Sequence, residues 1–260
     1  MKITGGTLSD YLAATLESAQ EHQKIAPELM PLVVQMDEVF QSEILGCDFD
    51  VDPATGVLAM HAYTMLLSSV REALSGHVVS TFPIVRAALE SACYAYLIAK
   101  DPDKGVVWLD RHQSDAALKK CRNTFTAKRA AEELERSHPG MAEWVMALYE
   151  ASIDFGAHPN QKSVVGHLTD GGTVDDEFQM FELTGVYGHD SWEVNRALLA
   201  CVETGQAVAF MLAACADHHP LLNERIEVLQ GWIDRKNKVV EEIKGGLIEY
   251  DGPLYCSVTR

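Results

Sequence analysis

The sequence lacks the short motifs that identify most known chemistries. It has no Walker-type phosphate loop, no G-x-G-x-x-G dinucleotide fingerprint, no G-x-S-x-G nucleophile elbow and no H-E-x-x-H zinc pattern. Its six cysteines include no C-x-x-C pair and no spacing typical of metal ligands. We therefore expect no bound metal and no cofactor.

Positive charge is also scarce. The chain has 21 Lys and Arg against 38 Asp and Glu, which gives a net charge of −17. Such a field repels phosphate backbones at long range, so a general DNA- or RNA-binding protein is not expected. A local basic site for one small anion remains compatible with this composition.

No secretory signal is expected either, because the opening "MKITGGTLSDYL" contains no apolar stretch. Three of the cysteines lie in apolar helical runs, where thiols are usually buried and reduced. Residues 78–99 are apolar enough to test as a membrane span, but Pro83, Arg86 and Glu90 favour a core helix. We expect a cytoplasmic protein without membrane association.

What the sequence does contain is helical periodicity along nearly its whole length. It predicts an all-α, multi-helix bundle forming one domain over residues 1–245, followed by a non-helical tail at 246–260. A small hairpin or irregular insertion is expected near 174–188, where aromatic residues alternate. Two helices with almost no charge, 78–99 and 197–216, should lie at the centre. Longer helices are expected at about residues 10–24, 27–45, 54–74, 80–100, 106–122, 123–136, 141–155, 191–216 and 220–244.

Arg86 and Glu90 are the only charged residues of the first central helix, and they share one face. An intrahelical pair is more favourable with Glu first, so we expect each to reach a partner on another helix, with Arg111 as a candidate for Glu90. Two interpretations remain open: a buried network that fixes helix register, or a polar pocket.

The stretch "DFGAHPNQKSVVGH", residues 154–167, is the most motif-like part of the chain. Gly156 is expected to end a helix in the left-handed conformation. His158 would then be the N-cap of the next helix, with Pro159 at its first position. A histidine at a helix N-terminus is disfavoured as a cation, so it should stay able to accept a proton or bind a ligand.

The blocks "FPIVRAALESACYAYLIAKDPDKGVVWLDRH" and "YEASIDFGAHPNQKSV" resemble an uncharacterised family of bacterial all-helical proteins, which is similar to the higher eukaryotes and prokaryotes nucleotide-binding (HEPN) superfamily. The resemblance covers about residues 82–165. Arg86, Glu90 and His158 match its polar pattern, and Arg111 matches it less closely. Many HEPN proteins are metal-independent ribonucleases with an R-x(4–6)-H motif. Arg71 to His77 fits that spacing, but about one such match is expected by chance.

Two functions follow. The first is a regulatory or small anionic-ligand (nucleotide-like) binding domain that forms a homodimer through apolar helix faces. Its polar pocket would consist of Arg86, Glu90, Arg111 and His158, with Asn160 as a further ligand-binding residue. The alternative is a HEPN-like ribonuclease or nucleotide-cleaving enzyme, with His158 as catalytic acid or base and the arginines stabilising phosphate charge. A metal-dependent hydrolase and a purely structural partner protein complete the alternatives.

Overall fold

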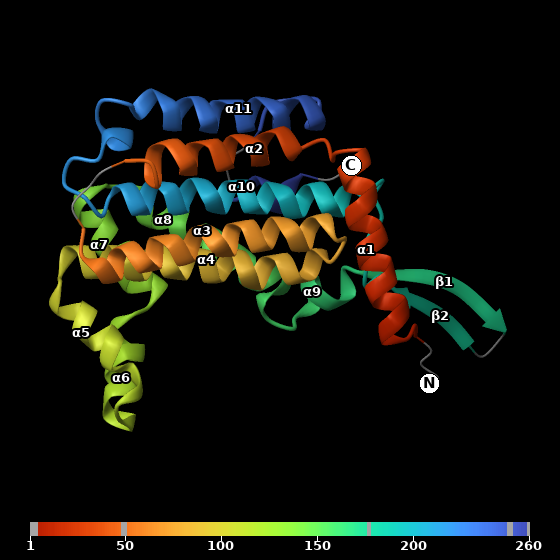
Figure 1. Ribbon diagram of the computed structural model, residues 1–260. Coiled ribbons are helices and arrows are strands. Elements are labelled where there is room, and N and C mark those ends of the chain that lie inside the picture. The colour runs from red at the N-terminus through yellow and green to blue at the C-terminus, as the bar shows by residue number, and fades with distance from the viewer. Residues whose placement is uncertain (1–4, 48–50, 176–177, 249–251, 259–260) are drawn as a thin grey trace.

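The computed structural model describes residues 5–47, 51–175, 178–248 and 252–258, and it forms an elongated helical bundle (Figure 1). The α-helices are α1 (Leu8–Lys24), α2 (Met30–Val39), α3 (Pro53–Leu74), α4 (Val78–Lys100), α5 (Asp103–Leu109), α6 (Asp115–Thr124), α7 (Ala127–Ser137), α8 (Met141–Ser152), α9 (Gln161–Val165), α10 (Trp192–Ala213), α11 (Ile226–Lys244) and α12 (Leu254–Ser257). Shorter helical turns are η1 (Phe40–Ile44), η2 (Asp110–His112), η3 (Ile153–Ala157) and η4 (Pro220–Leu222), and the strands are β1 (Leu168–Asp175) and β2 (Phe178–Leu183).

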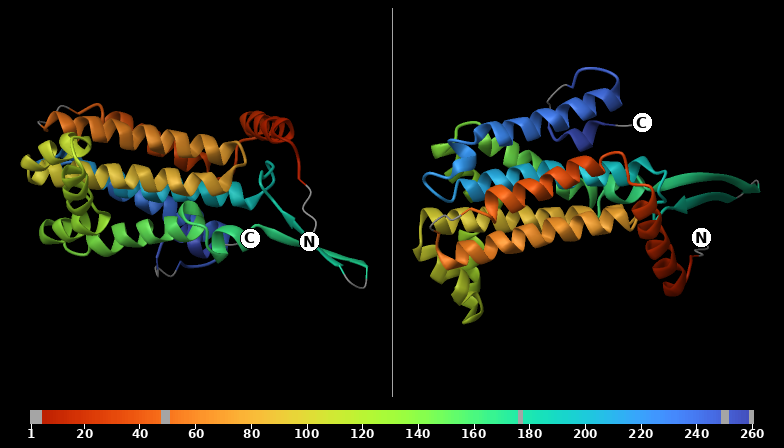
Figure 2. Two further views of the ribbon diagram at one scale, coloured as in Figure 1. Left: turned by 90° about the horizontal axis from the view of Figure 1, so that it is seen from below. Right: turned by 45° about the horizontal axis from the view of Figure 1, so that its top comes forward.

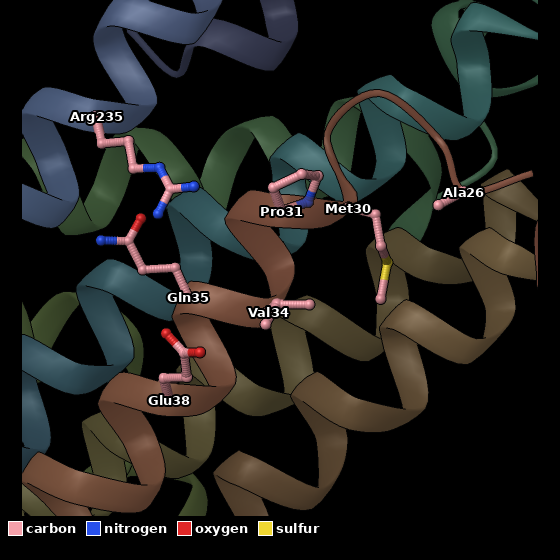
Figure 3. Close-up of a pocket in the computed structure, with 7 residues that line it drawn as sticks. All are labelled: Ala26, Met30, Pro31, Val34, Gln35, Glu38 and Arg235. Carbon is pink, nitrogen blue, oxygen red and sulfur yellow. The ribbon is translucent and has the colours of Figure 1, made fainter.

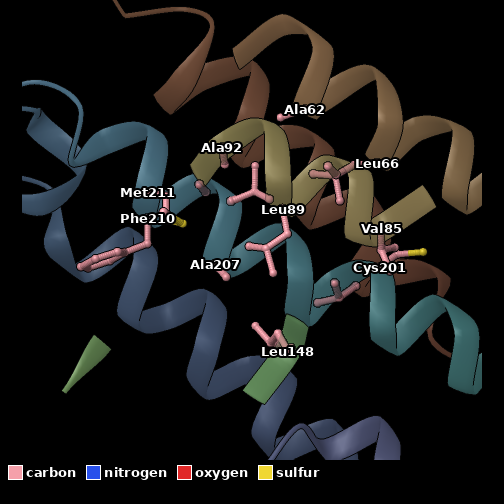
Figure 4. Close-up of a cluster of buried hydrophobic side chains, with 14 of the residues drawn as sticks. Ala62, Leu66, Val85, Leu89, Ala92, Leu148, Cys201, Ala207, Phe210 and Met211 are labelled. Atoms are coloured by element: carbon pink, nitrogen blue, oxygen red, sulfur yellow. The ribbon is translucent and has the colours of Figure 1, made fainter. Parts of the chain in front are cut away.

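Two apolar helices, α4 and α10, form the centre of the bundle, as the sequence predicts. From Ala197 onward every side chain of α10 is buried, because α2, α3, α4 and α8 surround it. Leu66 of α3, Leu89 of α4 and Leu148 of α8 converge on Ala207 and its neighbours (Figure 4). The predicted all-α bundle is confirmed.

Length and composition alone would also allow α4 and α10 to cross a membrane. Within their most apolar windows, 61% of α4 and 94% of α10 are buried inside the protein. Core helices of soluble proteins meet the same criterion, so it is weak evidence for a membrane span.

One end of the bundle has a different architecture. Helix α1 crosses it at a steep angle to the long helices, and the antiparallel β1–β2 hairpin projects beside α1 (Figures 1 and 2). The hairpin starts at Leu168, earlier than the expected 174, and β1 includes the sequence "TDGG" at 169–172. A register shift between Asp170 and Gly172 allows this, since Gly172 has a φ of +84° that favours glycine.

Two other expectations were wrong in detail. The helix expected at 106–122 is divided into α5, η2 and α6, because the Ser114 side chain caps α6 by accepting from the Ala117 amide. The tail is not free of helix: α12 lies within it, and Leu254, Tyr255 and Val258 are buried. The apolar side chains of the tail explain this, since they pack against the bundle.

Candidate functional site

The Arg86 guanidinium is the centre of a polar cluster on the outer flank of α4. Its Nε donates to Glu90 Oε1 at 3.1 Å, its Nη2 to the Tyr149 hydroxyl at 2.7 Å, and its Nη1 to His158 Nε2 at 3.1 Å. The guanidinium carbon also lies 4.7 Å from the centre of the Tyr149 ring. We call these four residues the Arg86 patch. It joins α4, α8 and the loop after η3.

The pairing within α4 differs from the expectation. Glu90 pairs with Arg86 of its own helix, although the Arg-first order is the less favourable one. Contacts from α8 and the loop fix the guanidinium and so override this weak preference. The two side chains are 22% and 32% exposed, so the cluster is not a closed buried network.

Arg111, in η2, lies outside the patch. No ion pair with Glu90 is found in the part of the chain that the structure describes, and the buried Nε of Arg111 has no hydrogen-bond partner there. Burial first, and the Glu90 carboxylate second, raise the pKa of Tyr94 to about 12, while Arg111 opposes this shift. The charge of Arg111 therefore acts on Tyr94, which lies one helical turn after Glu90 on α4.

Asn160, not His158, is the N-cap of α9. The Asn160 Oδ1 accepts from the Ser163 amide at 3.1 Å, and its Nδ2 donates to the carbonyls of Ile153 and His158. Asparagine is the stronger capping residue, which explains the shift of two positions from the expected helix start. The side-chain amide of Asn160 therefore stabilises the loop, because backbone groups bond both its oxygen and its nitrogen.

Gly156 brings this loop close to α4. Its φ of 173° is extended, so the expected left-handed helix stop was wrong. A Cβ at this position would lie 2.5 Å from the Val79 carbonyl oxygen and 3.1 Å from the Phe82 side chain. Only glycine permits this approach, and the approach sets His158 against Arg86.

The hydrogen bond from Arg86 determines which ring nitrogen of His158 accepts. A guanidinium can only donate, so the exposed His158 accepts at Nε2 and its proton is on Nδ1, the other ring nitrogen. Burial raises the pKa of Tyr149, with Arg86 lowering it and Glu90 raising it further. Tyr149 therefore remains a neutral hydroxyl at neutral pH. Sequence analysis missed it, because its nine-residue distance from His158 is not a recognisable spacing.

The Arg86 patch is open to solvent in part, since the Arg86 and Glu90 side chains are 22% and 32% exposed. One cavity, of about 370 Å³, lies between α2 and α11 and includes Met30, Val34 and Arg235 (Figure 3). A second, of about 220 Å³, lies where α4, α7 and α10 end and includes Lys100, His138 and His219. Neither is lined by a residue of the patch. Within the described ranges no group of three His, Cys, Asp or Glu is arranged to hold a metal.

No protein-family model, curated protein or solved structure matches the chain.

The residues of the formal R-x(4–6)-H match form separate contacts. Arg71 is exposed at the end of α3 and pairs with Glu72. His77 Nδ1 bonds the Tyr11 hydroxyl at 2.8 Å and is also within reach of Ser80. These interactions connect α1 to the turn between α3 and α4, and they account for His77 without a catalytic role.

Proposed function

We propose that this protein is a cytoplasmic ligand-binding domain that holds a small, nucleotide-like anion at the Arg86 patch. The observation on which this depends is the fixed guanidinium of Arg86. Three of its five N–H donors are engaged by Glu90, Tyr149 and His158, which leaves two for a ligand. A guanidinium already held in place loses little further entropy when it binds a carboxylate or phosphate.

His158 adds a third donor. Its Nε2 accepts from Arg86, so its Nδ1 can donate, and the side chain is exposed. The hydroxyl of Tyr149 fixes the other side of the guanidinium. These contacts favour recognition of an anion over acid–base catalysis, because the Nε2 lone pair of His158 is already occupied.

Arg111 supports a ligand larger than inorganic phosphate. Its charge acts on Tyr94, and the eight residues from Arg86 to Tyr94 correspond to about 12 Å along α4. A nucleotide is long enough to span such a separation, whereas a single phosphate is not. The buried Nε of Arg111, which has no hydrogen-bond partner in the described chain, would gain an acceptor from such a ligand.

Calorimetric titration with AMP, ADP and inorganic phosphate tests the proposal. We expect Arg86→Met to weaken nucleotide binding by about 100-fold, because a charged hydrogen-bonding group is worth about 1.5–3 kcal/mol. The matched control is Arg136→Met, which removes an exposed arginine paired with Glu133 on α7 and should leave binding unchanged. Full binding by both Arg86→Met and His158→Ala would refute the site.

We also propose that the protein is a homodimer. The outer face of α3 exposes Val57, Met60 and Leu67, at 61%, 53% and 44% of their surface. Residues 53–70 contain no Asp, Glu, Lys or Arg, in a chain with a net charge of −17. An exposed apolar face of this kind suits pairing with a second copy.

A further inference from the structure

The C-terminal segment 252–258 is held to α10 by a buried carboxylate. Glu203 Oε1 accepts from the Leu254 amide at 3.1 Å, and Oε2 accepts from the Tyr255 amide at 3.0 Å. The ammonium of Lys236, on α11, lies 3.1 Å from Oε1 and compensates the buried charge. Glu203 and Lys236 are only 4% and 5% exposed, so these bonds are shielded from water.

A second anchor lies nearer the start of α10. The Val258 carbonyl accepts from Trp192 Nε1 at 3.3 Å and from Arg196 Nη2 at 3.4 Å. The segment thus runs antiparallel to α10, with one anchor toward each of its ends. The side chains of Leu254 and Val258 are buried and add to the core.

The Tyr255 ring connects this segment to the candidate site. It is fully buried, and its centre lies 5.9 Å from that of Phe82 and 5.7 Å from that of Phe155. The two phenylalanine rings also contact each other at 5.6 Å. Phe82 is one turn before Arg86 on α4, and Phe155 is three residues before His158 in η3. Tyr255 therefore contacts one residue near each partner of the Arg86–His158 hydrogen bond: Phe82 near Arg86, and Phe155 near His158.

We infer that the docked segment 252–258 positions the Arg86 patch, with Tyr255 as the positioning residue. With Tyr255 in place, η3 is held against α4 and the His158 ring faces Arg86. Without the Tyr255 ring, Phe155 loses one of its two aromatic contacts and the space beneath η3 is empty. The loop then shifts, and a hydrogen bond of 3.1 Å between its end and α4 is lost.

Besides Tyr255, the loop is supported by Gly156, which packs directly against Val79 and Phe82 of α4. Helix α9 has only five residues, and Lys162 bonds Asp154 within the same loop, so that pair moves with it. The Lys162 ammonium also lies 5.8 Å from the Phe155 ring. The Phe155 ring contacts two buried aromatic rings, those of Phe82 and Tyr255.

The experiment compares full-length Tyr255→Ala, Tyr255→Leu and Tyr255→Phe with the native chain, each first checked for native helix content by circular dichroism. The measured signals are the His158 imidazole resonances and the rate of proteolysis at residues 153–167, both without ligand. Tyr255→Ala should shift the His158 signals and raise the cleavage rate about tenfold, since local opening becomes easier. Tyr255→Leu, which fills more of the site and folds if the alanine variant does not, should show the same changes to a smaller degree.

Tyr255→Phe is the rescue variant, because the Tyr255 hydroxyl is buried without a hydrogen-bond partner in the described chain. It should behave as the native protein, and so should Ser257→Ala, an exposed change in the same short helix. Native His158 signals and native cleavage in folded Tyr255→Ala and Tyr255→Leu would overturn the inference.

The ligand function is tested separately in the same proteins. One consequence of the positioning role of Tyr255 rests on the proposed function. If the patch binds a nucleotide, AMP affinity should be about tenfold weaker in Tyr255→Ala than in Tyr255→Phe. If the native protein binds no nucleotide, the proposed function fails, while the His158 and proteolysis measurements still decide the role of Tyr255.

Discussion

Helices α10 and α4 both contain a long apolar run with few charges, one at 197–213 in α10 and two at 78–99 in α4. These charges have opposite surroundings. In α10, Glu203 is 4% exposed and is satisfied by Lys236 and two backbone amides. In α4, Arg86 and Glu90 are at the edge of the core, and both are partly open to water. An isolated charge in an apolar helix can thus belong to the core or to a surface site, and its neighbours decide which.

The difference arises from how each helix is covered. Helix α10 is enclosed on all sides, so the charge of Glu203 is tolerable only with a buried partner and hydrogen bonds. Helix α4 has one flank that α8 and the loop after η3 cover incompletely, and there water shares the solvation of Arg86 and Glu90. Removing one partner should therefore destabilise the protein far more in the first pair than in the second.

Replacing the two glutamates tests this contrast most directly. Glu203→Ala leaves Lys236 buried without its partner and removes the acceptor of two amides, so we expect the free energy of unfolding to fall by about 3–5 kcal/mol. Glu90→Ala removes half of a partly exposed pair and should cost less than about 1 kcal/mol. Urea unfolding followed by circular dichroism measures both. Equal losses of unfolding free energy in the two variants would show that the different burial of Glu203 and Glu90 does not affect stability.

Gly156→Ala tests how tightly the loop of the Arg86 patch is joined to α4. Its Cβ would lie 2.5 Å from the Val79 carbonyl oxygen, so the loop must move, at a cost of about 1–3 kcal/mol. The control is Gly231→Ala in α11, where nothing lies within 4 Å and the change should stabilise by about 0.5–1 kcal/mol. Thermal unfolding of both variants measures the difference. A Gly156→Ala protein as stable as the native chain would mean that the loop does not depend on close packing.

The sequence predicts the helices well because their signals are local. Apolar periodicity gives α3, α4 and α10 almost to the residue, and the near absence of charge identifies the two central helices. Helix-capping signals are also local, but neighbouring residues can compete for the N-cap position. His158 and Asn160 are two residues apart, and the better capping side chain, Asn160, determines where α9 begins. The predicted start of the hairpin, at 174, was too late because Gly171 and Gly172 of β1 are more typical of a loop.

The candidate site could be predicted only in part. Arg86, Glu90 and His158 stand out as polar residues in unusual places, and the structure brings them together. Tyr149 and Tyr255 could not be found, because their roles depend on which helix faces lie side by side in the fold. The same applies to the tail, whose Leu254 amide reaches Glu203 across 51 residues of sequence.

The smallest expected effect concerns the region where α4 and α10 end. His138 lies there, with its ring 5.3 Å from Phe210 of α10, and burial first and the Lys100 ammonium of α4 second lower its pKa. A lowered histidine pKa means that the unfolded chain binds more protons, so stability is lost as pH falls below about 6.5 and through the folded value.

Lys100→Met should therefore raise the pKa of His138 only part of the way toward its ordinary value, since burial, the larger cause, remains. An NMR titration of the imidazole signals measures this. His167 is the internal control: its pKa is also lowered mainly by burial, with Glu193 and Arg196 as the charges that act on it, so it should not respond. A full return of the His138 pKa in Lys100→Met would show that charge and not burial dominates at this end of the bundle. The environment there would then be closer to the open flank of α4 than to the enclosed α10.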